Sequence, residues 1–144
     1  MANIIPDAFK SELLSGTHDF SSGGNTFKIA LYVTTLGPPY TTSSTVYSTD
    51  NEVSSSGTGY ATGGQTLDSQ AVSVPGSNTA IVDFANEVFS SVTLTSLGAA
   101  IYNSDKSNKL CLVIDFGGDK VATSGDFTIQ FPAAAASTAI IQVA

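Results

Sequence analysis

The stretch that most constrains the fold of this chain is residues 110–131, LCLVIDFGGDKVATSGDFTIQF, where apolar side chains are densest. Residues 110–116 are nearly continuously apolar, which is typical of a strand covered on both faces. In residues 127–131, Phe and Ile alternate with Thr and Gln, as in a strand with one buried face. The glycines and short polar side chains between these two arms favour a reversal of the chain. The sequence therefore predicts a β-hairpin at the centre of a buried β-core.

Shorter segments predict the strands that surround this hairpin. The clearest is residues 27–33, in which Phe, Ile, Leu and Val alternate with Lys, Ala and Tyr. The glycines of residues 57–64 predict a bend with Tyr60 packed on the sheet, because a phosphate-binding loop would need a buried strand before it and a helix after it. Turn residues separate the other predicted strands, which are residues 72–74, 80–84, 89–94, 99–103 and 140–143.

One short helix is predicted near the N-terminus, over about residues 5–15. Ile5, Phe9 and Leu13 recur every four residues, and Gly16 stands at the position of a helix C-cap. This apolar stripe should close one end of the β-core. The pattern as a whole predicts an all-β fold, an antiparallel, jelly-roll-like β-sandwich that forms a single domain over residues 1–144.

Residues 36–50 form the longest segment without a strand pattern. They contain Pro38, Pro39 and a tract rich in Thr and Ser, with too few apolar side chains to bury and two prolines that disfavour a central strand. We expect a long exposed loop here. Long loops on small domains are often the parts that contact other molecules.

The charge of the chain excludes some classes of partner. Five lysines, no arginine and twelve acidic residues give a formal charge of −7. An acidic surface without guanidinium groups disfavours nucleic acid. No apolar run approaches the length of a membrane span, and the N-terminal residues do not resemble a secretory signal, so we expect no membrane contact and synthesis in the cytoplasm.

Few residues could support catalysis. The one histidine, His18, lies in a polar stretch beside Asp19, where we expect a solvent-exposed or turn-bonded side chain. The one cysteine, Cys111, lies in the most apolar strand and is expected to be a packed thiol. These two residues cannot form a zinc site, and we expect no cofactor and no enzymatic activity. Asp115, Asp119 and Asp126 lie near one predicted turn and leave a Ca²⁺ site as an alternative.

Several short motifs follow one another in a characteristic order along most of the chain. The motifs are Met-Ala-Asn at 1–3, TFKIAL at 26–31, GTGY at 57–60, Gly-Gly at 63–64, AIY at 100–102, IDFG at 114–117, Ser-Gly at 124–125 and FTIQF at 127–131. In their order and spacing they resemble a family of small structural proteins that are encoded in tailed bacteriophage genomes.

This resemblance implies a decoration or cement protein on the outside of a phage capsid. Its partner would be the major capsid protein, and its location would be the exterior of the virion. The alternative is a tail, neck or fibre component that contacts other virion proteins or a host glycan. A hydrolase is the weakest alternative, because no pair of nucleophile and base can be named.

The residues themselves suggest where such a protein would make contacts. The segment 36–50 cannot bury itself, and the C-terminal end is apolar, so one of them is expected at a subunit contact of a homo-oligomer. The candidate contact residues are Pro38, Pro39, Tyr40, Tyr47, Ile140, Ile141 and Val143.

Overall fold

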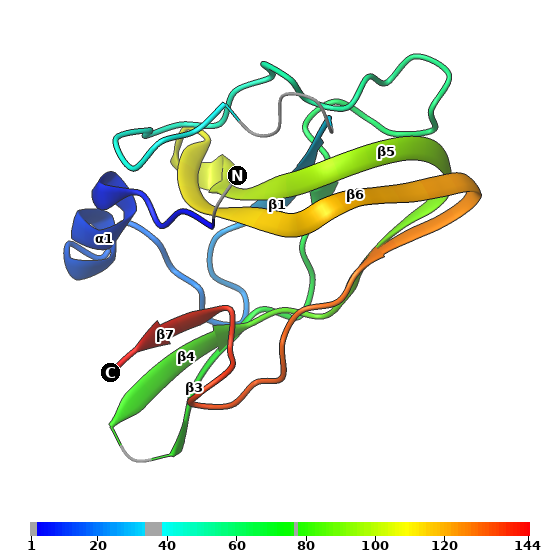
Figure 1. The fold of residues 1–144 in the computed structure, drawn as a ribbon. Coiled ribbons are helices and arrows are strands. Elements are labelled where there is room, and N and C mark those ends of the chain that lie inside the picture. The colour runs from blue at the N-terminus through cyan, green and yellow to red at the C-terminus, as the bar shows by residue number, and fades with distance from the viewer. Residues whose placement is uncertain (1–2, 34–38, 77) are drawn as a thin grey trace.

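A ribbon of two long antiparallel strands, β5 (Glu87–Asn103) and β6 (Lys109–Ile129), dominates the fold (Figure 1). The structure is a computed structural model, and it describes residues 3–33, 39–76 and 78–144. Within these residues the chain forms two antiparallel sheets and one short helix. The predicted all-β, sandwich-like fold is therefore confirmed, while the jelly-roll connectivity stays a prediction.

The two sheets differ in size, and apolar side chains from both of them form one core on the inner side of the ribbon. The larger sheet has the order β2-β1-β5-β6, where β1 is Phe27–Tyr32 and β2 is Gln65–Thr66. The smaller sheet has the order β3-β4-β7, formed by Ala71–Gly76, Thr79–Asp83 and Ile141–Val143. The predicted C-terminal strand therefore exists, and it pairs with β4 through Val82 and Ile141.

The predicted hairpin within residues 110–131 is wrong, because both arms belong to the single strand β6. The polar segment between the arms stays paired with β5, as Val121 opposite Thr95 shows. Gly117 and Gly118 have positive φ angles of 72° and 145°, and the pairing register shifts nearby. Glycines in such an irregularity bend a strand without reversing it. The strand curls so far that the rings of Phe116 and Phe127 come within 6.0 Å of each other.

The reversal of the chain lies instead between β5 and β6. A short 3-10 turn, Ser104–Lys106, is followed by Ser107 and Asn108, both with left-handed backbones. The strands predicted at 89–94 and 99–103 are likewise parts of one strand, β5, because register shifts around Val92 and Gly98 accommodate the intervening residues within the ladder.

The predicted helix is present as α1 (Asp7–Leu14), slightly shorter than expected. Gly16 has a φ of 73°, its N–H donates to Leu13 O, and the N–H of Thr17 donates to Glu12 O. These two bonds form a Schellman motif, which ends the helix where the glycine permits a left-handed backbone. Phe9 on the buried face of α1 packs edge-on against Phe20 and so closes one end of the core.

The main core lies inside the curled ribbon. It contains the inward side chains of β1 together with apolar residues from β4, β5 and β6. Phe20 stacks on Phe27 at 4.1 Å with nearly parallel rings, and Phe84 meets both of them edge-on. Cys111 is fully buried here, as predicted.

A second apolar cluster covers the outer face of the larger sheet. It consists of buried side chains from β1, β5, β6 and the segment after β1: Ala30, Tyr32, Tyr40, Ala100, Tyr102, Leu110 and Val113. Tyr40 is only 8% exposed, so the expectation of an exposed loop over residues 36–50 is wrong at this position. The segment has few aliphatic residues, and the apolar surface that it buries belongs to aromatic side chains. Among the described residues, no helix is long and apolar enough to cross a membrane.

The approach of β2 to β1 depends on one glycine. Gly64 has a φ of 71°, and a Cβ added there would lie 1.8 Å from the carbonyl oxygen of Ile29. Gly57 has the same φ of 71°, but a Cβ there would meet nothing within 4 Å. The two glycines share one backbone conformation and differ only in the space around them.

We therefore expect Gly64→Ala to destabilise the protein much more than Gly57→Ala. The left-handed backbone should cost either variant about 1 to 2 kcal/mol, and the collision with Ile29 should add about 1 to 3 kcal/mol or prevent folding of Gly64→Ala. Urea denaturation of both variants measures the difference. Equal loss of stability in the two would show that β2 does not pack against β1 as closely as described.

Candidate functional site

The residues predicted as partner contacts fall into three different environments. Pro38 lies outside the described residues, and Pro39 is exposed. Tyr40 and the half-buried Tyr47 belong to the second cluster on the sheet. The C-terminal residues divide between two surfaces: Ile141 is buried, Ile140 is half-buried, and Val143 is 57% exposed. The structure does not bring these seven positions into one site, and their role in partner contacts stays a prediction.

Tyr40 is tied to the sheet by hydrogen bonds. Its Oη lies 2.5 Å from Tyr32 Oη and accepts a hydrogen bond of 2.9 Å from the N–H of Ser48. The Tyr32 hydroxyl donates to Ser48 O at 2.8 Å. Burial raises the pKa of both phenols, so they stay neutral and able to donate. These hydrogen bonds hold residues 40–48 against the sheet.

Glu52 fixes the next part of the chain. Its carboxylate accepts hydrogen bonds from the hydroxyls of Tyr47 at 2.6 Å and Tyr60 at 2.7 Å, and from the N–H of Gly63 at 2.7 Å. The Tyr60 hydroxyl in turn accepts from the N–H of Leu31 on β1. The predicted packing of Tyr60 on the sheet is confirmed. Sequence reasoning missed Glu52, although an acid between two tyrosine-containing segments was an available signal.

His18 lies in the core, so the expectation of an exposed or turn-bonded histidine is wrong. Its ring is packed against Phe9 at 5.1 Å, and Nε2 lies 2.8 Å from Glu12 Oε2. Nδ1 lies 3.0 Å from Asn103 Nδ2, which can only donate. Nδ1 is therefore the acceptor and Nε2 the donor, which describes a neutral ring. Phe20, two residues further along, was an available signal, because alternate residues of an extended segment share a face.

The surroundings of His18 favour this neutral state. Removal from water lowers the pKa of His18, and the hydrogen bond and negative charge of Glu12 oppose this only in part. Burial by itself raises the pKa of Glu12, but hydrogen bonds from Lys109 and His18 outweigh it and lower the pKa overall. Cys111 lies 3.9 Å from His18 Nδ1, and burial strongly raises the pKa of its thiol. Both side chains are buried in the interior.

The three aspartates of β6 do not form a cation site. In the part of the chain that the structure describes, no three His, Cys, Asp or Glu side chains gather closely enough to hold a metal ion. Asp115 Oδ1 accepts from the N–H of Gly117, and Asp126 Oδ1 accepts from the N–H of Ser91 at 3.3 Å. Two of these carboxylates thus support irregular backbone in the ribbon.

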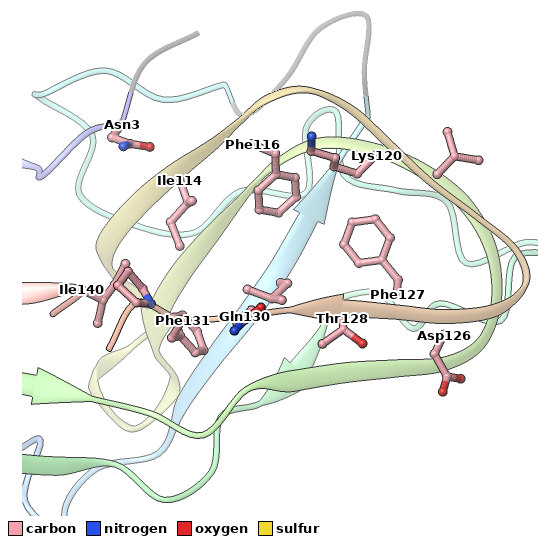
Figure 2. A pocket seen from close by; sticks show the side chains of 13 residues that line it. Asn3, Ile114, Phe116, Lys120, Asp126, Phe127, Thr128, Gln130, Phe131 and Ile140 are labelled. Carbon is pink, nitrogen blue, oxygen red and sulfur yellow. The ribbon is translucent and has the colours of Figure 1, made fainter. Parts of the chain in front are cut away.

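An apolar groove opens between the two arms of β6, with a volume of about 480 Å³. Figure 2 shows Ile114 and Phe116 on one arm pointing toward Phe127 and Phe131 on the other. Ile140 and Asn3 lie at one end of the groove, and Lys120 and Asp126 lie at its margin. Sequence reasoning missed this groove because it exists only where the strand curls. It is the best candidate for a binding site.

A second apolar surface lies on the smaller sheet. Val72 is paired with Val82, and Ala80 is paired with Val143, so alternate residues place Val72, Val74 and Val143 on one face. These three side chains are 52%, 65% and 57% exposed. We name them the valine face. Beside it, Leu13 of α1 and Phe20 line a hollow of about 370 Å³.

Comparisons of the chain with protein-family models, with curated proteins and with solved structures find no match. The candidate sites therefore depend on geometry. Two apolar surfaces on a firmly bonded β-frame can bind other proteins, whereas His18 and Cys111 are enclosed.

The environment of His18 predicts a pH-dependent stability. The unfolded chain takes up a proton on His18 near pH 6.5, while the native ring stays neutral to lower pH because its pKa is lowered. The unfolded state then binds more protons, so the free energy of unfolding should fall as the pH drops below 6.5, by at most about 1.4 kcal/mol per pH unit from this group. Glu12 should extend the loss below about pH 4.5.

His18→Gln is the matched variant for this measurement. Glutamine keeps a donor for Glu12 but cannot titrate, so the variant should be less stable by about 2 kcal/mol at pH 7.5 and lose the pH dependence just below 6.5. Urea denaturation from pH 7.5 to 5 measures both effects. A variant with the wild-type pH profile would show that His18 is not the titrating group.

Proposed function

We propose that this chain is a structural protein of a tailed-phage virion, a decoration or cement protein that binds the outer surface of the major capsid shell and stabilises it. The sequence resemblance to small phage structural proteins suggests this role. The observation that carries it is the pair of exposed apolar surfaces, the valine face and the β6 groove, on a rigid β-frame. Such surfaces suit permanent contacts with a repeated protein lattice.

The chemistry of the interior supports a binding role over a catalytic one. The histidine and the cysteine are both buried and contact each other. The carboxylates of Glu12 and Glu52 form internal hydrogen bonds. The tyrosine hydroxyls of the second cluster are also used internally. These bonds make the frame rigid, which lowers the entropic cost of binding.

The valine face supports the proposal of a homo-oligomer. Val143 belongs to the apolar C-terminal end that was expected at a subunit contact, and it lies on the same sheet face as Val72 and Val74, where that face extends beyond the buried Val82 and Ile141. Burying such a face against a second copy would remove apolar area from water. An oligomer with several shell contacts would then gain affinity through avidity.

The proposed function predicts that purified protein binds shells that lack it. Undecorated shells of the phage that encodes this chain should retain the protein on co-sedimentation, at a copy number that rises with the area of the shell, and their melting temperature should rise. A small fixed copy number per particle would favour the alternative, a tail, neck or fibre component. Absence from the particle altogether would contradict both.

The homo-oligomer proposal predicts that Val143→Asp reduces the mass of the protein in solution. The side chain is exposed, so folding should persist, whereas a charge buried at a subunit contact is strongly unfavourable. Val46→Asp is the matched control, because Val46 is 49% exposed but lies in the segment over the other sheet. Analytical ultracentrifugation compares the two variants. Dissociation by Val46→Asp alone would place the contact in segment 36–50 instead.

A further inference from the structure

The outer edge of β6 is only partly covered by its own chain. Val113 exchanges two hydrogen bonds of 2.9 Å with Ile4, and the N–H of Leu110 donates to Thr45 O at 3.0 Å. β6 is the last strand of its sheet; beyond Val113 the N–H of Asp115 donates to Asn3 Oδ1 at 2.7 Å, and the described residues form no further β-bridge with this edge. An uncovered strand edge presents backbone donors and acceptors that favour pairing with another chain.

The second arm of β6 directs such groups toward the groove. The N–H of Phe131 donates to Asn86 Oδ1, on the side of β5, and Ile129 and Phe127 lie opposite Glu87 and Phe89 of β5. Because backbone groups alternate in direction along a strand, the N–H and C=O of Thr128, between Phe127 and Ile129, point away from β5. The side chain of Thr128 is exposed and lines the groove.

The groove beside this edge accepts apolar side chains. Ile114 and Phe116 are half-buried, and Phe127, Ile129 and Phe131 are buried at its base. A segment that paired with the edge at Thr128 would place every second side chain between the two arms. The hollow and the free backbone groups thus belong to one extended binding site.

The charge of the whole chain indicates the sign of the occupant. The margin of the groove itself carries one exposed cation and one exposed anion, Lys120 and Asp126, and the exposed Asp119 lies outside the lining. The chain as a whole carries a formal charge of −7. A second copy of this chain would bring a like charge to the site. A basic segment of another protein is complementary to it.

We propose that the groove binds an extended segment of another protein, with alternating apolar side chains and basic residues, which adds as a strand to the free edge of β6. The inference rests on the proposed function in naming the partner, because the segment would then belong to the major capsid protein. The apolar side chains enter the groove between the two arms of β6, beside the Phe116 and Phe127 rings, which already pack against each other. The basic residues lie near Asp119 and Asp126.

Thr128→Pro tests the strand addition, with Thr128→Val as the matched control. Proline removes the outward N–H and is tolerated at an edge strand, whereas valine keeps the N–H and removes only the hydroxyl. Two probes are used: undecorated shells, and a synthetic ten-residue peptide that alternates valine and lysine. Thr128→Pro should bind both about tenfold more weakly than wild type, and Thr128→Val should bind within about twofold of wild type.

Charge variants at exposed positions test the sign of the partner. Lys120→Glu should strengthen binding of the valine–lysine peptide, and Asp119→Lys should weaken it, with both effects shrinking at high salt. A peptide that alternates valine and glutamate is the control and should bind more weakly than the lysine peptide. Equal binding of the two peptides, or changes opposite to these, would contradict a basic occupant.

The outcomes separate this inference from the proposed function. If wild type binds shells and Thr128→Pro binds them equally well, the strand-addition inference is wrong while the decoration role stands. If the valine–lysine peptide binds in a Thr128-dependent manner but shells do not bind, the groove is supported and the capsid partner is wrong. If Thr128→Pro lowers the mass of the protein itself in ultracentrifugation, the occupant is a second copy and the inference is overturned.

Discussion

Continuous pairing of β5 with β6 is the constraint on which the rest of the structure depends. Thirteen paired positions run from Glu87–Ile129 to Asn103–Lys109, so the ribbon cannot separate into independent hairpins. The positive φ angles of Gly117 and Gly118 allow it to bend instead. This bend brings Phe116 to Phe127, encloses the main core, and leaves the groove where the two arms of β6 separate. The bend of the ribbon therefore creates both the interior and the best candidate binding site.

Polar hydrogen bonds then attach the remaining chain to this ribbon. Glu52 joins Tyr47, Tyr60 and Gly63, and Asn103 at the end of β5 joins His18 and Asn25. No buried side-chain nitrogen or oxygen of the described residues lacks a hydrogen-bond partner. Full satisfaction of buried polar groups favours one well-defined arrangement. It also removes the reactive side chains from solvent, which is why the candidate sites are apolar surfaces.

These surfaces are consistent with one role in a larger assembly. The valine face lies on the smaller sheet and the groove lies on the edge of the larger one, so a self-contact and a partner contact would use different elements. The fold in Figure 1 places β3, β4 and β7 apart from the free edge of β6. A protein with two separate apolar contacts on a rigid frame can bridge neighbouring subunits, as the proposed cement role requires.

The sequence by itself determined the local features of this protein: the strand at 27–32 from its alternation, the short helix with its Gly16 cap, the bend at Tyr60, the buried thiol of Cys111 and the all-β class. Each of these features depends on neighbouring residues or on the spacing at which apolar residues recur along the chain. Only the tertiary structure decided that residues 110–131 continue as one bent strand, that Tyr40 is buried and that His18 lies in the core. The glycines at 117 and 118 permit a turn and a bulge equally well, and only pairing with β5 selects the bulge. Burial of Tyr40 and His18 likewise requires partners, Tyr32 and Asn103, whose proximity no local pattern in the sequence encodes.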